Sequence, residues 1–168
     1  MKDLIPVAGI TSAILVGRAS HLSFRDDVGL RAPTFGDAAL WIFLLAGWML
    51  GSNYFLSWRG PWDFTTWRNA SLLVAALRVI GVCILAPISE EMIFRGLFYR
   101  YFSRTKLGVP LTIIVLAAGW TVLHNLYLPN PISVVFIAGL LLGAARWRTK
   151  SVYIPIAMHM VFNLYAIW

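Results

Sequence analysis

The side chains of this chain that could do chemistry are few, and most of them lie in apolar sequence. The chain has 168 residues with only seven acidic side chains, and its two glutamates, Glu90 and Glu91, are neighbours in the run ILAPISEEMIFRGLF. Two of its three histidines, His124 and His159, also lie in apolar segments. Ionisable side chains inside a membrane are costly and rare, so these residues are candidates for a functional site.

Helical spacing assigns different roles to the two glutamates. Glu91 and Arg95 stand at positions i and i+4 of a predicted helix, where they can form an ion pair. Glu90 lies about 100° away around the same helix and points elsewhere. Arg95 can therefore neutralise Glu91, while Glu90 stays available for chemistry.

The same spacing places polar pairs on two further predicted helices. Trp120 and His124 share one helix face, and His159 and Asn163 share another. Three helices can therefore direct polar groups to one buried point. A carboxylate beside an imidazole, facing an amide and a second imidazole, is a set that can activate a water and stabilise an oxyanion.

Each of these residues also has a structural interpretation. A buried ion pair such as Glu91–Arg95 mainly neutralises itself, and a lone histidine in a span often makes only a helix–helix hydrogen bond. Asn163 and Trp120, each taken alone, favour structural roles, Trp120 through packing. Glu90 is the hardest to explain structurally, because no residue near it in the sequence pairs with it.

A metal site is the alternative chemistry. Glu90, His124 and His159 match the two histidines and one glutamate that bind zinc in a class of hydrolases. The chain lacks HExxH, the usual helical arrangement that places two histidines on one metal. We therefore rank a mechanism without any cofactor first and a zinc site second.

The composition indicates which elements carry these residues. Hydrophobic residues make up 60% of the chain, charged residues make up 12%, and the mean hydropathy is +0.75. Soluble domains carry about 25% charged residues, so the composition argues against a soluble globular enzyme and favours a multi-span membrane protein. The formal charge of +7 indicates basic loops that face the cytoplasm and anionic lipid, with no role in nucleic-acid binding.

The apolar segments predict an all-α membrane bundle of about six transmembrane segments, with residues 1–168 as a single domain. The first, Leu4–Gly17, reaches only about 21 Å as a helix, which is shorter than the hydrocarbon core of a membrane. The sequence therefore leaves open whether this segment crosses the membrane. The third is about 30 residues long, and Pro87 should kink or break it. A polar loop is expected at Arg18–Asp37. The other expected elements are spans at Ala38–Trp58, Ser71 to beyond Phe98, Val109–Tyr127, Ile132–Ala145 and Val152–Trp168, a loop at Arg59–Asn69 and a turn at Pro129–Pro131.

The basic residues predict the orientation. Counted over alternate loops, ten lysines and arginines fall on one side of the membrane and three on the other. The positive-inside rule places the larger group in the cytoplasm and the C-terminus outside.

The depth of His124 below the cytoplasmic surface argues against a site shared with Glu90 and His159. His124 lies 18 residues from Lys106, or about 27 Å along a helix. Glu90 and His159 lie only about 14–15 Å from their nearest cytoplasmic basic residues. The site closes only if the fourth helix tilts or starts outside the membrane, or if the third helix breaks at Pro87.

Three short motifs resemble those of the CAAX protease and bacteriocin-processing family of intramembrane endopeptidases, also called Abi proteins. The family pattern EExxxR corresponds to Glu90–Arg95, which the typical Gly96 follows. The pattern FxxxH corresponds to Trp120–His124, with Trp in place of Phe, and HxxxN corresponds to His159–Asn163. The resemblance covers about residues 70–168, which would form the catalytic core.

The resemblance implies an active site inside the membrane. Glu90 and His124 would activate a water, His159 and Asn163 would stabilise the oxyanion, and the Glu91–Arg95 pair would support them. The substrates would be membrane proteins or peptides in the lipid bilayer, and the short chain favours a bacterial plasma membrane. The need for a prenyl group and the oligomeric state stay open.

Two other classes of function remain. The first is a non-catalytic bacteriocin-immunity or interaction protein of the same fold, but such a protein could lose Glu90 or His124 freely. The second is a small proton-coupled transporter with a relay through Glu90, His124 and His159, although the short chain leaves little room for paired repeats.

Overall fold

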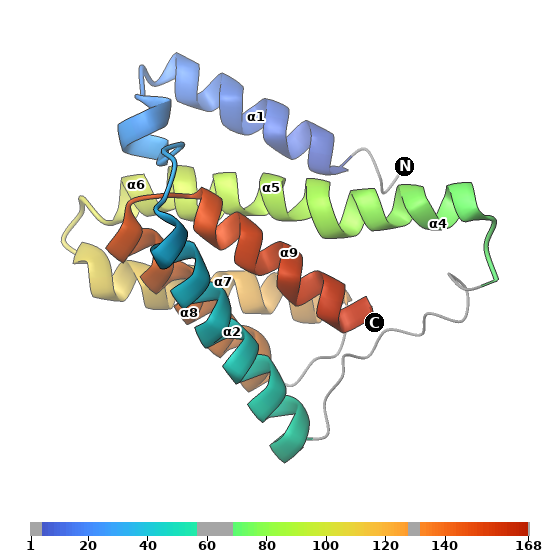
Figure 1. Ribbon diagram of the computed structural model, residues 1–168. Coiled ribbons are helices and arrows are strands. Elements are labelled where there is room, and N and C mark those ends of the chain that lie inside the picture. Colours follow the sequence, from blue (N-terminus) through green and yellow to red (C-terminus); the bar gives the residue numbers. More distant parts are fainter. Residues whose placement is uncertain (1–4, 57–68, 128–131, 168) are drawn as a thin grey trace.

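The computed structural model describes residues 5–56, 69–127 and 132–167, and this part of the chain is helical with no strand (Figure 1). Each of the six predicted apolar segments corresponds to a helix, so the all-α prediction is confirmed. The predicted turn at Pro129–Pro131 and nearly all of the loop at Arg59–Asn69 lie outside the described residues. Besides one long helix, the structure contains α1 (Ile5–Ala19), α2 (Phe35–Leu56), α7 (Gly108–Tyr127), α8 (Ile132–Thr149) and α9 (Tyr153–Ile167).

The long helix runs for 31 residues, Leu72–Phe102. Pro87 does not break it, so the predicted break does not occur. The segment just before Pro87 is π-helical, and its wider turns make room for a ring that would clash with the preceding turn of an α-helix. In order, the helix consists of α4 (Leu72–Val79), π-helical η3 (Ile80–Leu85), α5 (Ala86–Glu91), π-helical η4 (Met92–Phe98) and α6 (Tyr99–Phe102).

The core of the bundle forms around α8, which packs against α7, α2 and α9. Gly139 and Gly143 of α8 have the GxxxG spacing that lets two membrane helices approach closely. A β-carbon at Gly143 would lie 2.7 Å from Cγ2 of Ile113, and one at Gly139 would lie 3.1 Å from Cβ of Ala117, both on α7. The core residues are Leu45, Met49, Trp120, Val134, Val135, Ala138, Leu142, Ala145, Ile154, Met158 and Phe162.

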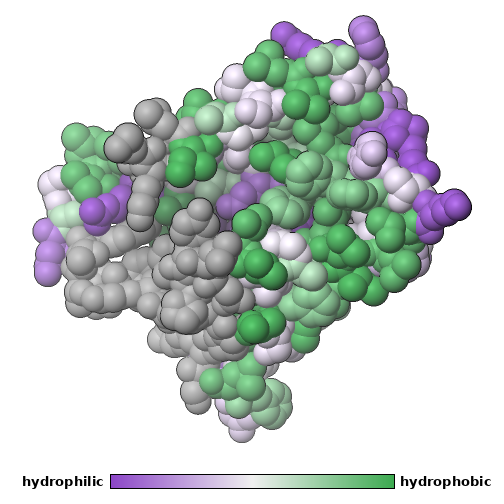
Figure 2. All heavy atoms as spheres, turned by 180° about the vertical axis from the view of Figure 1, so that it is seen from behind, coloured by the Kyte–Doolittle hydropathy of each residue, from purple (hydrophilic) through white to green (hydrophobic). Residues whose placement is uncertain are grey.

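The surface of the bundle is largely apolar on the face that Figure 2 shows. Phe35, Leu72 and Phe43 are 89%, 86% and 73% exposed, which suits contact with lipid rather than water. The chain is therefore a helical membrane protein. Among the described residues, three helices are long and apolar enough to cross a membrane: Phe35–Leu56, Leu72–Phe102 and Ile132–Thr149. Three apolar helices in the same part of the chain are shorter: Ile5–Ala19, Gly108–His124 and Tyr153–Ile167.

The predicted polar loop Arg18–Asp37 contains a short π-helical segment, η2 (Phe24–Val28), that the sequence pattern did not reveal. The Ser23 side chain caps it by accepting from the backbone N–H of Asp26. Gly29 ends it with φ at 91°, in the left-handed region that glycine adopts without strain. The loop is therefore an ordered element with its own caps.

Segment η2 packs against the long helix. Val28 is buried, and a β-carbon at Gly96 would lie 2.9 Å from Cγ1 of Val28. Arg146, a buried residue of α8, donates to the backbone carbonyls of Arg95 at 2.9 Å and Asp27 at 3.1 Å. One side chain thus joins η2, η4 and α8 close to the residues of the candidate site.

Candidate active site

Three helices bring three of the predicted site residues together. Glu90 lies on α5, His124 on α7 and His159 on α9. Each side chain contributes one potential ligand atom to a cluster in which these atoms all lie within 4.8 Å of one another. The three side chains converge, as their spacing predicts.

The helix ends explain how His124 reaches the depth of Glu90. The long helix continues past Arg100 to Phe102, and α7 begins only at Gly108. Glu90 lies twelve residues before Phe102, and His124 lies sixteen residues after Gly108. This difference of four residues is about one turn, or ~6 Å, and helical side chains lean toward the N-terminus of their helix. His124 therefore leans back toward Glu90, and no break at Pro87 is needed.

Glu90 accepts a hydrogen bond from a side chain that the sequence assigned to packing. The indole Nε1–H of Trp120 donates to Oε2 of Glu90 at 2.8 Å. Nε2 of His124 lies 3.9 Å from the same oxygen. The side chains of Glu90 and His124 are 33% and 22% exposed, so a substrate can reach this part of the cluster.

The protonation of His124 follows from its other ring nitrogen. Nδ1 lies 3.0 Å from the backbone carbonyl of Trp120, which can only accept, so Nδ1 carries a proton. In the neutral ring, Nε2 then presents a lone pair toward Glu90. At a separation of 3.9 Å, one water can hydrogen-bond to both groups.

Glu91 lies in a buried network beside this cluster. Its Oε1 accepts from Arg95 at 2.9 Å and from Nδ1 of His159 at 2.9 Å. Arg95 also donates to the carbonyl of Gly139 at 3.2 Å. The predicted ion pair is confirmed, and the structure adds His159 and the backbone of α8 to it.

The network leaves one ring nitrogen for a ligand. Among the described residues, three buried atoms have no hydrogen-bond partner: Oε2 of Glu91, Nε of Arg95 and Nε2 of His159. A buried polar atom without a partner costs about 1–3 kcal/mol. Because Nδ1 of His159 is bound to Glu91, Nε2 is the atom that can contact a substrate, a water or an ion.

Asn163 directs an amide N–H away from the cluster, to the carbonyl of Val82 at 2.8 Å. Val82 lies in η3, where the N–H of Ala86 bonds to the Gly81 carbonyl five residues back. In this register the Val82 carbonyl would pair with residue 87, but Pro87 has no N–H. Asn163 therefore satisfies a carbonyl that the proline leaves free.

Trp120 contacts four of the six candidate residues, among them Glu90 through its indole N–H. Its ring centroid lies 4.1 Å from that of His124 and 5.1 Å from that of His159, and Cζ of Arg95 lies 5.0 Å from the Trp120 ring. Trp120 is only 1% exposed. Its indole N–H, which the usual phenylalanine lacks, is the sequence signal that could have indicated this role.

The donor atoms of the cluster also fit a metal ion. His124 and His159 each have Nε2 free while Nδ1 is bound, to the Trp120 carbonyl and to Glu91 respectively. This is the arrangement that orients histidine ligands in metal sites. With the Glu90 carboxylate, it gives the two-histidine, one-glutamate set of catalytic zinc.

Comparison with known proteins yields one family. The family model described as "Type II CAAX prenyl endopeptidase Rce1-like" matches residues 70–165, a range that contains every candidate residue. No solved structure gives a significant match.

Two curated bacterial proteins match parts of the chain. An Escherichia coli protein described as "Uncharacterized 24.3 kDa protein" is 30% identical over 105 residues, which is 60% of this chain and 47% of that protein. The Lactococcus lactis subsp. lactis protein "UPF0177 protein YajF" is 35% identical over 63 residues, 36% of this chain and 31% of that protein. The matched part of the chain thus spans less than half the length of these relatives.

Proposed function

The chain belongs to the type II CAAX prenyl endopeptidase Rce1-like family, and from this premise we propose that it is an intramembrane endopeptidase that hydrolyses peptide bonds of membrane-associated proteins or peptides. The observation that carries the proposal is the cluster of Glu90, His124 and His159 within 4.8 Å, with its accessible side formed by Glu90 and His124.

In the proposed reaction, a water between Glu90 and His124 is the nucleophile. Glu90 takes a proton from the water as the water oxygen bonds to the substrate carbonyl carbon. The second O–H of the water donates a hydrogen bond to Nε2 of His124. Glu90 then gives this proton to the amide nitrogen as the C–N bond breaks. The products are one carboxyl terminus and one amine, and Glu90 returns to the carboxylate.

The negative charge on the carbonyl oxygen is assigned to His159 and Asn163. A protonated His159 would donate from Nε2, and the Glu91 carboxylate at its Nδ1 supports the charged ring. An amide has two N–H groups, and the one on Val82 leaves a second for the oxyanion. Glu91 and Arg95 are positioning residues because they hold His159 rather than the substrate.

Zinc is the second chemistry that the donor atoms support. Glu90, His124 and His159 would hold the ion, which would supply a Lewis acid and lower the pKa of a bound water. The residues that surround the cluster would keep the same orienting roles under either chemistry.

The cell membrane and the orientation are also proposed. The two bacterial relatives and the basic loops support a bacterial plasma membrane with several crossings and an external C-terminus. Cysteine labelling from either side of intact cells, with single cysteines at the two ends in a Cys83→Ser background, would test this orientation.

Peptide release by the purified full chain in detergent tests the activity. Glu90→Gln removes the base while keeping the shape, and we expect activity to fall by about 10²–10⁴-fold. Asp37→Asn, at a partly buried acidic residue in the first turn of α2, is the control and should keep activity. Release that survives Glu90→Gln would contradict the mechanism, and no release by the wild type from any membrane substrate would favour the non-catalytic or transport classes.

The same assay in the presence of a chelator distinguishes the metal-free mechanism from the zinc mechanism. Activity that persists in chelator supports the metal-free mechanism. Activity that is lost in chelator and restored by added zinc, but not by magnesium, would replace it with the zinc mechanism.

A further inference from the structure

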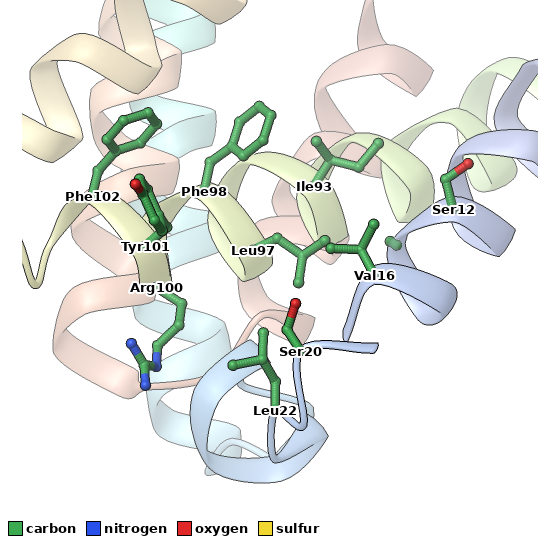
Figure 3. A pocket seen from close by; sticks show the side chains of 11 residues that line it. Ser12, Val16, Ser20, Leu22, Ile93, Leu97, Phe98, Arg100, Tyr101 and Phe102 are labelled. Carbon is green, nitrogen blue, oxygen red and sulfur yellow. The ribbon is translucent and has the colours of Figure 1, made fainter. Parts of the chain in front are cut away.

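A cavity of about 520 Å³ lies between α1 and the segments η4 and α6 of the long helix (Figure 3). Ala13 and Val16 of α1 line one wall, and Leu97 and Phe98 of η4 line the other. These walls are apolar, and the volume lies within the range of about 300–1,000 Å³ that small-molecule sites occupy. None of the residues proposed for catalysis lines this cavity.

The two ends of the cavity differ in chemistry. Figure 3 shows Ser12 and Ile93 toward one end and the guanidinium of Arg100 toward the other. The lining runs along α1 from Ser12 to Val16, about 6 Å of helix, and continues past the end of α1 to Ser20 and Leu22, so the cavity is elongated along the bundle.

The end at Arg100 carries an excess of positive charge. Arg100 and Arg104 both donate to the same oxygen of Asp27, Oδ1, so one carboxylate serves two guanidinium groups. The Arg104 side chain is 61% exposed. Residues 18–28 and 100–106 meet at this end. Together they contain five lysines and arginines but only two aspartates.

We infer that this cavity binds one acyl chain of an anionic phospholipid, with the lipid phosphate at Arg100 and Arg104. An apolar slot along the helices fits a chain that runs parallel to them from the membrane surface. Arginine is the side chain best suited to bind phosphate oxygens, and a basic pocket between membrane helices is the usual form of an anionic headgroup site. The net positive end selects an anionic headgroup over a zwitterionic one of the same chain length.

Native mass spectrometry of the full chain in detergent tests the inference without any peptide cleavage, so its result is independent of the proposed function. The probes are dioleoyl phosphatidylglycerol and dioleoyl phosphatidylcholine, which differ only in the headgroup. We expect one phosphatidylglycerol to remain bound with a Kd about fivefold below that of phosphatidylcholine for each arginine that contacts it. Equal retention of both lipids would overturn the inference.

Two variants separate the chain site from the headgroup site. Val16→Trp fills the cavity, and we expect it to weaken phosphatidylglycerol binding about tenfold, equivalent to two methylene groups no longer buried. Val115→Trp on α7 is the matched control, because Val16 and Val115 are 51% and 46% exposed and only Val16 lines the cavity. Equal binding by these two variants would contradict the chain site.

Arg104→Gln tests the headgroup at an exposed position, so it remains informative if Val16→Trp does not fold. It should weaken phosphatidylglycerol binding about fivefold and leave phosphatidylcholine unchanged. A third probe, a farnesylated peptide, covers the competing occupant. If that peptide binds and phosphatidylglycerol does not, and if Val16→Trp abolishes peptide binding, the cavity belongs to a lipidated substrate and the inference is wrong.

Discussion

At the scale of single residues, Trp120 distinguishes this site from the usual pattern. The sequence placed an aromatic ring there and assigned it to packing, and the structure adds a hydrogen bond from its indole to Glu90. Spacing along one helix identifies the face on which Trp120 lies, but not which ring atom meets a carboxylate on another helix. The Glu91–Arg95 pair was predictable because both residues lie on the same helix.

We expect Trp120→Phe to lower kcat about tenfold with little change in KM. Phenylalanine keeps an aromatic ring in the core but removes a charge-assisted hydrogen bond, and ten-fold corresponds to about 1.4 kcal/mol. Trp48→Phe is the matched control, since its indole donates at 3.1 Å to the Val134 carbonyl away from the cluster. Equal kinetic losses in the two variants would show that Trp120 acts only through packing.

The same hydrogen bond has a spectroscopic signature. In ¹⁵N-labelled protein, the indole N–H resonance that disappears in Trp120→Phe should move when Glu90 is changed to Gln. A resonance that does not move would contradict the contact.

We expect Arg95→Ala to destabilise the protein by about 3–5 kcal/mol and to abolish activity. The change leaves the Glu91 carboxylate buried with only His159 as its partner. Arg25→Ala, at an exposed arginine of η2, should have little effect on either property. Unfolding in detergent, followed by circular dichroism, checks both variants, and normal stability of Arg95→Ala would argue against the ion pair.

At the scale of the elements, hydropathy predicted the six apolar helices and missed what lies between and within them. Segment η2 has no apolar run that hydropathy could detect. It is held instead by the Ser23 cap, by Gly29 and by contacts with residues far along the chain. The π-helical turns of η3 carry no periodic signal either. They are visible in the sequence only as Pro87, which the usual rule interprets as a kink or a break.

The carbonyl of Val82 links two elements that the sequence treats separately. Because Pro87 cannot supply an N–H, η3 depends on the amide of Asn163 on α9. Asn163 therefore has a structural role in addition to the one proposed at the oxyanion, and loss of activity in an Asn163 variant does not by itself identify an oxyanion donor.

The contact between α7 and α8 gives a prediction at this scale. A methyl group at Gly143 would lie 2.7 Å from Cγ2 of Ile113, a branched side chain with little freedom to move. We expect Gly143→Ala to destabilise the protein by about 1–3 kcal/mol, measured as a fall in unfolding free energy. Gly119→Ala is the control, because a β-carbon there meets nothing within 4 Å. Similar stabilities of the two variants would show that α7 moves aside without cost.

At the scale of the whole molecule, the sequence predicted the bundle and the convergence of three helices. It did not predict the clamps, by which we mean the side-chain contacts of Asp27 and Arg146 that hold η2 against the rest of the bundle. Asp27 and Arg100 are 73 positions apart, and Arg146 joins η2 to η4 from a third element. Contacts at such separations leave no pattern in a single sequence. The depth that argued against the site was measured from Arg100 and Lys106, and neither residue marks the end of its helix.

The Asp27 clamp makes stability depend on pH. The hydrogen bond from Arg100, followed by the backbone N–H of Ser23, lowers the pKa of Asp27 below its usual value of 3.8. A carboxylate with a lowered pKa adds stability above its unfolded pKa and loses it as the pH falls through the folded value. We therefore expect the unfolding temperature to decrease when the pH is lowered below about 4. Asp27→Asn should reduce this dependence on pH. An unchanged pH profile in Asp27→Asn would contradict the clamp.

The order of the helices along the chain has a consequence for when the candidate site becomes complete. Glu90, Glu91 and Arg95 are synthesised first, His124 follows, and His159 arrives on α9 after all of them. Until α9 inserts, Glu91 lacks one of its two hydrogen-bond donors and the Val82 carbonyl lacks its amide. Assembly in the membrane would therefore keep the site incomplete throughout translation of the first five apolar helices. Under the proposed function, a nascent chain could not cut its neighbours at the translocon.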